Sequence, residues 1–329
     1  MQLGYGESLF LIAFDHRSSF SRGLFGASEP VPPAILAGIA DAKELIFEAF
    51  EQAIARGASR KRCGILVDEQ FGASVARKAK ASGLLLAMPV EQSGQREFHL
   101  QYGEEFGRHI ETFDPSFCKV LVRYNPEGDR ALNKRQTEKL ARLSEWLHAH
   151  QRKFLLELLV PATPEQLERC GSQDDFDREL RGRLVVDVVR EMQAGGVEPD
   201  IWKIEGLETA AECERVVEQA RAGVGRGSVV CIVLGRGASH ARVLGWLATA
   251  APVAGWDGFA IGRTLWLEAI EGYVAGSTTR EEARREIADR YLSALAAYAE
   301  SSRHGRVGAT PAAARADGDR KVCPPAEPE

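Results

Sequence analysis

The chain has 329 residues, a formal net charge of −5 and a hydrophobic fraction of 44%, a composition typical of a globular protein. The acidic balance argues against a protein that binds nucleic acid through a basic surface, so we expect no nucleic-acid partner. No apolar run approaches the roughly 20 residues of a membrane span and no basic leader opens the chain, so we expect no membrane partner and a cytoplasmic location.

Apolar runs of strand length alternate with segments of helical periodicity along most of the chain. The predicted strands, in chain order, are residues 9–14, 64–67, 84–88, 118–124, 154–159, 201–206, 229–234 and 259–261. The predicted helices cover residues 34–56, about 69–81, 103–110, 140–147, 184–192, 213–220 and 243–247, with a last helix after Thr279.

Eight strand–helix repeats of this regularity predict a single (β/α)8 barrel, the α/β fold called a TIM barrel, over residues 1–301. A doubly wound open sheet is the alternative, but no Gly-x-Gly-x-x-Gly follows the first strand. Residues 302–329 are rich in alanine, proline, glycine and charge without periodicity, which indicates a disordered tail.

Charged side chains lie at the ends of the predicted strands, where a barrel carries its active site. Several interrupt apolar runs, because Glu157 lies among leucines and Lys203 lies between Trp202 and Ile204. Burying an unpaired ion costs several kcal/mol, so we expect these groups to pair with one another in the barrel mouth. A buried ion network without chemistry is the alternative interpretation. The candidates are Asp15, His16, Asp68, Glu91, Lys119, Arg123, Glu157, Lys203 and Glu205.

The strand around Lys203 indicates which reaction these charged residues could catalyse. Lys203 and Glu205 share one face of the strand, and neighbouring cations in a low dielectric favour the neutral amine of a lysine. A neutral amine attacks carbonyl carbon. Glu157 and Glu205 are placed to move protons, and Asp15 could take a hydroxyl proton during carbon–carbon cleavage. These residues together meet the requirements of a Schiff-base aldolase.

Two glycine–arginine pairs predict a phosphate site. Gly235-Arg236 follows the seventh strand and Gly262-Arg263 follows the eighth, the two loops that often bind phosphate in barrels. Glycine allows backbone N–H groups to approach an oxyanion, and arginine adds two further donors. We therefore expect a phosphorylated keto-sugar as substrate.

The sequence predicts neither a cofactor nor a metal. Its six cysteines form no Cys-x-x-Cys pair, and of its seven histidines only His16 stands at a strand end. A magnesium site from Asp15, Asp68 and Glu91 remains open as an alternative, as does a sensor that binds a sugar phosphate without cleaving it. The oligomeric state is open, with a homo-oligomer among the expectations.

Several motifs together resemble the class I aldolase barrels related to tagatose-bisphosphate aldolase. The resemblance is closest to the 5-dehydro-2-deoxyphosphogluconate aldolase domain often fused to 5-dehydro-2-deoxygluconokinase. It runs from about residue 9 to 298 and is carried by Ala13-Phe14-Asp15-His16-Arg17, Leu66-Val67-Asp68-Glu69-Gln70-Phe71-Gly72, Pro89-Val90-Glu91-Gln92-Ser93-Gly94, Lys119-Val120-Leu121-Val122-Arg123-Tyr124, Pro199-Asp200-Ile201-Trp202-Lys203 and Gly258-Phe259-Ala260-Ile261-Gly262-Arg263-Thr264.

The resemblance implies that Lys203 is the Schiff-base lysine, Glu157 the acid/base of the fifth strand, Lys119 the lysine of the fourth and Arg263 the phosphate-binding arginine. It places Arg17 among the substrate-binding residues. It also implies a role in inositol catabolism, with cleavage of 6-phospho-5-dehydro-2-deoxygluconate to dihydroxyacetone phosphate and malonate semialdehyde. The seventh strand departs from the pattern, because it ends in Leu-Gly-Arg-Gly where the tagatose-bisphosphate type has a Ser-Ala-Gly-like loop.

Overall fold

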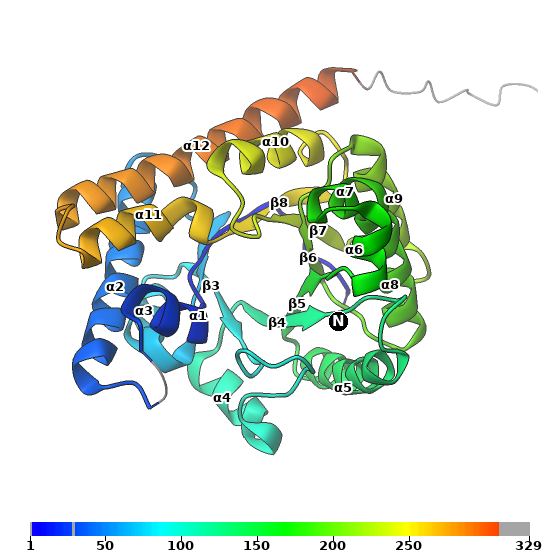
Figure 1. Ribbon diagram of the computed structural model, residues 1–329, viewed down its shortest axis with the longest axis horizontal. Coiled ribbons are helices and arrows are strands. Elements are labelled where there is room, and N and C mark those ends of the chain that lie inside the picture. Colours follow the sequence, from blue (N-terminus) through cyan, green and yellow to red (C-terminus); the bar gives the residue numbers. More distant parts are fainter. Residues whose placement is uncertain (1, 28–29, 309–329) are drawn as a thin grey trace, which may run out of the picture.

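Eight parallel strands close into a barrel in sequence order in the computed structural model, which describes residues 2–27 and 30–308. Figure 1 looks onto this barrel and shows the helices arranged around it. The strands are β1 (Leu9–Ala13), β2 (Cys63–Leu66), β3 (Leu85–Pro89), β4 (Phe117–Arg123), β5 (Lys153–Leu159), β6 (Ile201–Glu205), β7 (Val230–Leu234) and β8 (Trp256–Ile261). The predicted (β/α)8 fold is confirmed, and the open sheet is excluded because β8 pairs with β1.

Each predicted helix is present. The longer helices are α1 (Ser18–Phe25), α2 (Pro33–Ala55), α3 (Glu69–Ala81), α4 (Phe106–Phe113), α5 (Arg130–Ala149), α8 (Gly182–Ala194), α9 (Ala210–Arg221), α10 (His240–Ala250), α11 (Arg263–Val274) and α12 (Arg280–Gly308). Short turns of helix precede some of them, namely η1 (Gly103–Glu105), α6 (Pro164–Cys170), α7 (Gln173–Phe176) and the π-helical turn η2 (Asp177–Arg181). The helices predicted from the sequence do not include α1, α6, α7 or α11. The first three are short and offer too few turns for a periodic apolar face.

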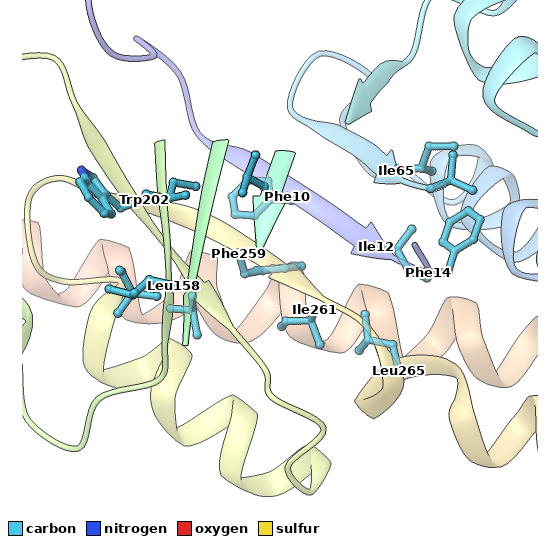
Figure 2. Close-up of a cluster of buried hydrophobic side chains, with 14 of the residues drawn as sticks. Phe10, Ile12, Phe14, Ile65, Leu158, Trp202, Phe259, Ile261 and Leu265 are labelled. Carbon is cyan, nitrogen blue, oxygen red and sulfur yellow. The ribbon is translucent and has the colours of Figure 1, made fainter. Parts of the chain in front are cut away.

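Alternation along the strands sorts their side chains into two layers. Phe10 and Ile12 of β1 face outward into the core between the barrel and its helices, where Phe10 packs against Phe259 of β8; Figure 2 shows part of this core. Leu9 and Leu11 face the barrel interior. Because successive side chains of a strand point to opposite faces, the interior row of each strand continues upward to the charged residues at the mouth.

The end of the barrel where the strands begin is closed. Tyr5 packs edge-on against Phe117 with ring centroids 5.1 Å apart. Beside them the fully buried Asp200 Oδ1 accepts from Gly4 N at 2.9 Å and Lys153 Nζ at 2.8 Å. Its Oδ2 accepts from Phe154 N at 2.8 Å and lies 3.4 Å from His148 Nε2. This carboxylate ties the segment before β1 to β5 and β6.

The long helix α12 lies outside the eight repeats and packs on α2, α10 and α11 (Figure 1). Its Tyr291 hydroxyl donates to Phe10 O at 2.8 Å, and its Tyr298 hydroxyl donates to Trp256 O at 2.5 Å. The helix therefore covers the seam between β1 and β8.

The helix α12 continues to Gly308, past residue 301 where the sequence placed the end of the barrel. Its capping box at Thr279 is present, and the helix continues beyond Tyr298, the last side chain that is buried among those described. The rest of the predicted tail, residues 309–329, lies outside the described residues. None of the helices in the described ranges has the length and apolar character that crossing a membrane requires.

Candidate active site

Five charged side chains converge inside the barrel mouth, in the wall of a cavity of about 340 Å³. Lys119 Nζ lies 2.7 Å from Asp15 Oδ2, 2.9 Å from Glu91 Oε1 and 3.0 Å from Glu157 Oε2. The second oxygen of Glu157, Oε1, lies 3.0 Å from Lys203 Nζ. Glu157 therefore bridges two lysines that are both almost fully buried.

Strand register explains why these residues meet. Glu157 of β5 is the register partner of Lys203 on β6 and of Leu121 on β4. Neighbouring strands lie about 4.8 Å apart, so the Lys203 and Glu157 side chains on the interior face are in reach of each other. Lys119 stands two residues before Leu121 and therefore shares that face.

The carboxylates fix the charge of Lys119. Burial disfavours its ammonium, but Asp15, Glu157 and Glu91 together raise the pKa of Lys119 well above its usual value. Burial also acts on Asp15, yet Lys119 and its neighbours hold the pKa of that carboxyl well below its usual value. At Glu91 burial prevails over Lys119 and Arg17, and the pKa of that carboxyl is raised. Lys119 is thus a permanent cation beside Lys203.

His16 lines the same cavity as a neutral imidazole. Burial is the main cause that lowers the pKa of His16 to about 4. The ring stands edge-on to Trp266 at 5.4 Å between centroids, and its Nδ1 is buried without a hydrogen-bond partner among the described residues. A Cβ at Gly262 would come within 3.0 Å of His16 Cε1 and 2.6 Å of Ala13 O. Only glycine fits between them.

The predicted phosphate loops differ from each other. Gly262 precedes the first turn of α11 and, with the exposed Arg263, lines the cavity. The guanidinium of Arg236 instead binds two carboxylates, with Nε 2.9 Å from Glu205 Oε1 and Nη1 2.8 Å from Asp177 Oδ2. Gly235 lies behind the cavity wall, next to Ile261.

Glu205 lies on the same face of β6 as Lys203, but it is not part of the cavity wall. Its Oε2 accepts from Val160 N at 3.0 Å, while its Oε1 binds Arg236. Both carboxylate oxygens of Glu205 therefore bind protein groups, as expected of a counter-ion to Arg236.

Asp68 is likewise outside the cavity wall. It accepts from Phe71 N at the start of α3 and forms a buried ion pair with Lys43 of α2. Lys43 also donates to Phe14 O at 2.6 Å and His16 O at 3.0 Å. The structure thus does not bring Asp68 together with Asp15 and Glu91, whose common partner is Lys119. No cluster of three or more metal-type side chains occurs in residues 2–27 and 30–308.

The cavity wall carries more basic than acidic side chains. Arg17, Lys119 and Lys203 face Asp15, Glu91 and Glu157, and Arg17 Nη2 lies 3.5 Å from Glu91 Oε1. Arg96, Glu97 and Arg236 pair with residues outside the wall. Within the described chain Arg123 and Arg263 then remain without an ion pair, and Arg123 donates only to Gln95 O at 3.4 Å. Their strands, β4 and β8, lie on opposite sides of the barrel.

The sequence did not predict the residues that pair with Asp68, Glu205 and Arg236 and hold them away from the other charged groups of the mouth. Lys43 lies in a helix that reads as apolar, and Asp177 and Arg181 lie in the turn η2 within a polar connection. The loop 92–98 forms one side of the cavity. In the sequence, only the motif that begins at Pro89 indicated that this loop belongs to the site.

Comparisons with known proteins agree with this fold. The family described as an uncharacterized protein conserved in bacteria (DUF2090) matches residues 4–302. A fructose-bisphosphate aldolase from Plasmodium falciparum, in complex with TRAP and a small-molecule inhibitor, is similar in structure with a TM-score of 0.62, 14% identity and coverage of 90% of this chain and 92% of that one. The protein Cgl0159 from Corynebacterium glutamicum is similar with a TM-score of 0.52, 21% identity and coverage of 87% and 88%. No curated protein matches the sequence significantly.

Proposed function

The chain belongs to the bacterial family DUF2090, and we propose that it is a class I aldolase that cleaves a phosphorylated keto-sugar or keto-sugar acid through a Schiff base on Lys203. One observation carries the proposal. Lys203 Nζ and Lys119 Nζ both lie 3.0 Å from the carboxylate of Glu157, next to an open cavity. A nucleophile, a proton carrier and a permanent cation thus stand in one row.

Schiff-base formation needs a neutral amine and a group that moves protons. Glu157 takes a proton from Lys203, and the freed amine attacks the ketone carbon of the substrate. The resulting carbinolamine loses its oxygen as water when Glu157 returns the proton to it, which leaves a protonated imine on Lys203. Lys119 keeps its own proton throughout, because three carboxylates hold it.

Carbon–carbon cleavage follows from the same geometry. Asp15 takes the proton of the hydroxyl on the second carbon from the imine carbon. A carbonyl forms on that second carbon as its bond to the carbon adjacent to the imine breaks. The electron pair of that bond moves into the imine, which becomes an enamine, and the aldehyde product leaves. Protonation of the enamine carbon and hydrolysis release the second product and restore Lys203. The Lys119 ammonium, 2.7 Å from Asp15, stabilises negative charge that develops on the reacting oxygen.

Within the described residues, Arg123 and Arg263 are the arginines of the cavity wall without an ion pair, and they favour a substrate with an anionic group at each end. Arg263, at the first turn of α11, suits a phosphate, which also benefits from the helix N-terminus. Arg123, across the barrel, suits a carboxylate or a second phosphate. The compound 6-phospho-5-dehydro-2-deoxygluconate carries a phosphate and a carboxylate at opposite ends. Its cleavage gives dihydroxyacetone phosphate and malonate semialdehyde, while bisphosphate or sulfo-sugar analogues share the doubly anionic pattern.

Borohydride trapping tests the proposal. The chain is incubated with dihydroxyacetone phosphate and borohydride, with and without EDTA, and peptides are analysed by mass spectrometry. We expect a stable adduct on Lys203, unaffected by EDTA, and none in Lys203→Met. An adduct on another lysine, or loss of ketose-phosphate cleavage on EDTA treatment without any adduct, would contradict the Schiff-base mechanism. Binding of ketose phosphates without cleavage of any would favour a sensor.

A further inference from the structure

Four charged residues form an ion network beside the cavity, and Arg236 is the one of them that lines the cavity wall. Arg181 is fully buried, and its Nη1 lies 2.9 Å from Asp177 Oδ2 and 4.0 Å from Glu205 Oε1. Arg236 contacts the same two carboxylates. Two cations and two anions therefore balance within this network.

The network joins the ends of several elements. Arg181 Nη2 donates to Gly206 O at 2.6 Å, just after β6, and Glu205 accepts from Val160 N just after β5. Asp177 and Arg181 both lie in η2, a π-helical turn, which is a rare conformation that is frequent at functional sites. Arg236 is the one member whose side chain is substantially exposed, at 30%.

Arg236 also has an unfavourable backbone conformation. Its φ of +52° is left-handed, which L-residues other than glycine seldom adopt, and Gly237 follows with a φ of +75°. Such a conformation persists when the surroundings fix the residue, as the two carboxylates do for the Arg236 guanidinium.

The backbone of Arg236 and Gly237, both in the left-handed conformation, contacts the side chain of Arg263. Arg236 O accepts from Arg263 Nη2 at 3.3 Å. A Cβ at Gly237 would stand 2.9 Å from the same nitrogen, so the guanidinium rests against the bare glycine backbone. One residue on, the Thr264 hydroxyl donates to Ala238 O at 2.8 Å, which fastens the same loop to α11.

We propose that the ion network Asp177–Arg181–Glu205–Arg236 holds the loop after β7 in this conformation and thereby positions Arg263 for an anionic group of the ligand. Arg236 and Glu205 are then positioning residues that do not touch the substrate. The inference deepens the proposed function, since it rests on Arg263 receiving the substrate's phosphate. It also assigns a purpose to the Leu-Gly-Arg-Gly ending of β7.

A matched pair of variants separates positioning from direct binding. Arg236→Ala and Arg236→Gly both remove the guanidinium and leave Asp177 and Glu205 with Arg181 as their remaining cation. Of the two replacements, only glycine enters the left-handed region without a steric penalty. We expect Arg236→Ala to bind inorganic phosphate about tenfold more weakly than Arg236→Gly, measured by calorimetry on the folded chain. Arg263→Ala should abolish phosphate binding. Equal affinities of the two Arg236 variants, or no binding by the wild type, would overturn the proposal.

Glu205→Gln provides a second variant with a milder change. It should raise the KM for a phosphorylated substrate several-fold, leave kcat nearly unchanged and leave the pH profile of kcat in place. A fall in kcat with a shifted pH profile would make Glu205 a proton carrier and overturn its positioning role. Asp174→Asn serves as a control, because Asp174 pairs with Arg242 on the surface close to η2.

Phosphate binding needs no turnover, so the two proposals fail separately. If no adduct forms on Lys203 while the Ala and Gly variants still differ, the aldolase proposal falls and the positioning of Arg263 stands. If the adduct forms and the variants bind phosphate equally, the reverse holds.

Discussion

The two ends of the barrel each bury a cluster of charges, but the clusters differ in what they leave unsatisfied. At the closed end, both oxygens of Asp200 have protein partners. At the mouth, three buried atoms of residues that line the cavity lack a hydrogen-bond partner among the described residues, namely His16 Nδ1, Arg17 Nε and Glu91 Oε2. The mouth also adjoins the cavity.

This contrast shows that a buried ion by itself does not mark a functional site. Asp200 and Lys119 are about equally inaccessible, at 0% and 2% exposure. A saturated cluster stabilises the fold, whereas a cluster with unused donors and acceptors beside a cavity can accommodate a ligand.

The largest effect is expected for Lys203→Met. Turnover should fall by at least about 10⁴-fold, as for other variants that lose a nucleophile. The melting temperature should change little, since Glu157 keeps its contact with Lys119. Steady-state kinetics and thermal unfolding check this, with Lys153→Met at the closed end as control. A variant that keeps its activity but unfolds early would show that both ends are structural.

Asp200→Asn should have the opposite effect, a loss of stability with little change in turnover. Removing one partner of a buried charge pair costs about 3–5 kcal/mol, so we expect a loss of that order in the free energy of unfolding. The kcat should change little, because Asp200 is not part of the cavity wall. Denaturant titration measures the stability. Asp289→Asn, in an ion pair that is about half exposed on both sides, should change it by less than about 1 kcal/mol.

The smallest effect is a pH dependence. The pKa of His16 is lowered from 6.5 to about 4, chiefly by burial, so the unfolded chain binds a proton there that the folded chain does not. Stability from this source is complete above pH 6.5 and is lost as the pH falls toward 4. We expect His16→Phe to flatten the curve of unfolding free energy against pH in this window.

The closed end should respond at lower pH. Burial opposes ionisation of Asp200, but hydrogen bonds from His148, Lys153 and Phe154 lower its pKa below 3.8, so its contribution persists until the pH falls below that value. Asp200→Asn should therefore keep the wild-type slope between pH 4 and 6.5. A slope that is lost in this variant and kept in His16→Phe would contradict the assignment.

The sequence predicted the fold and the row of charged groups in the barrel mouth for one physical reason. Because the side chains of a strand alternate between two faces, a charged side chain within an apolar strand points either to the barrel interior or to the helices. Glu157, Lys203 and Lys119 were therefore placed correctly relative to one another. Their distances follow from register, which a barrel fixes once its strands are known.

The positions of Asp68, Glu205 and Arg236 could not be predicted in this way. Each stands at a strand end as expected, but a charge distant in the sequence pairs with it. Lys43 pairs with Asp68 from α2, and Asp177 pairs with Arg236 from η2. Such pairings depend on how helices and connecting turns pack, and a single sequence carries little information about that.

The helix α12 has a consequence for the order in which the protein folds. Tyr291 bonds to Phe10 across 281 positions of the chain, and Arg280 reaches Glu48 across 232. During synthesis, β1 and α2 leave the ribosome long before the surfaces that cover them exist. The apolar faces of Phe10 and Phe50, which contact Tyr298 and Tyr291 in the finished barrel, stay exposed until the last helix is made. Contacts of this sequence separation fold slowly, so the nascent N-terminal half is the stage at which this chain most depends on protection from aggregation.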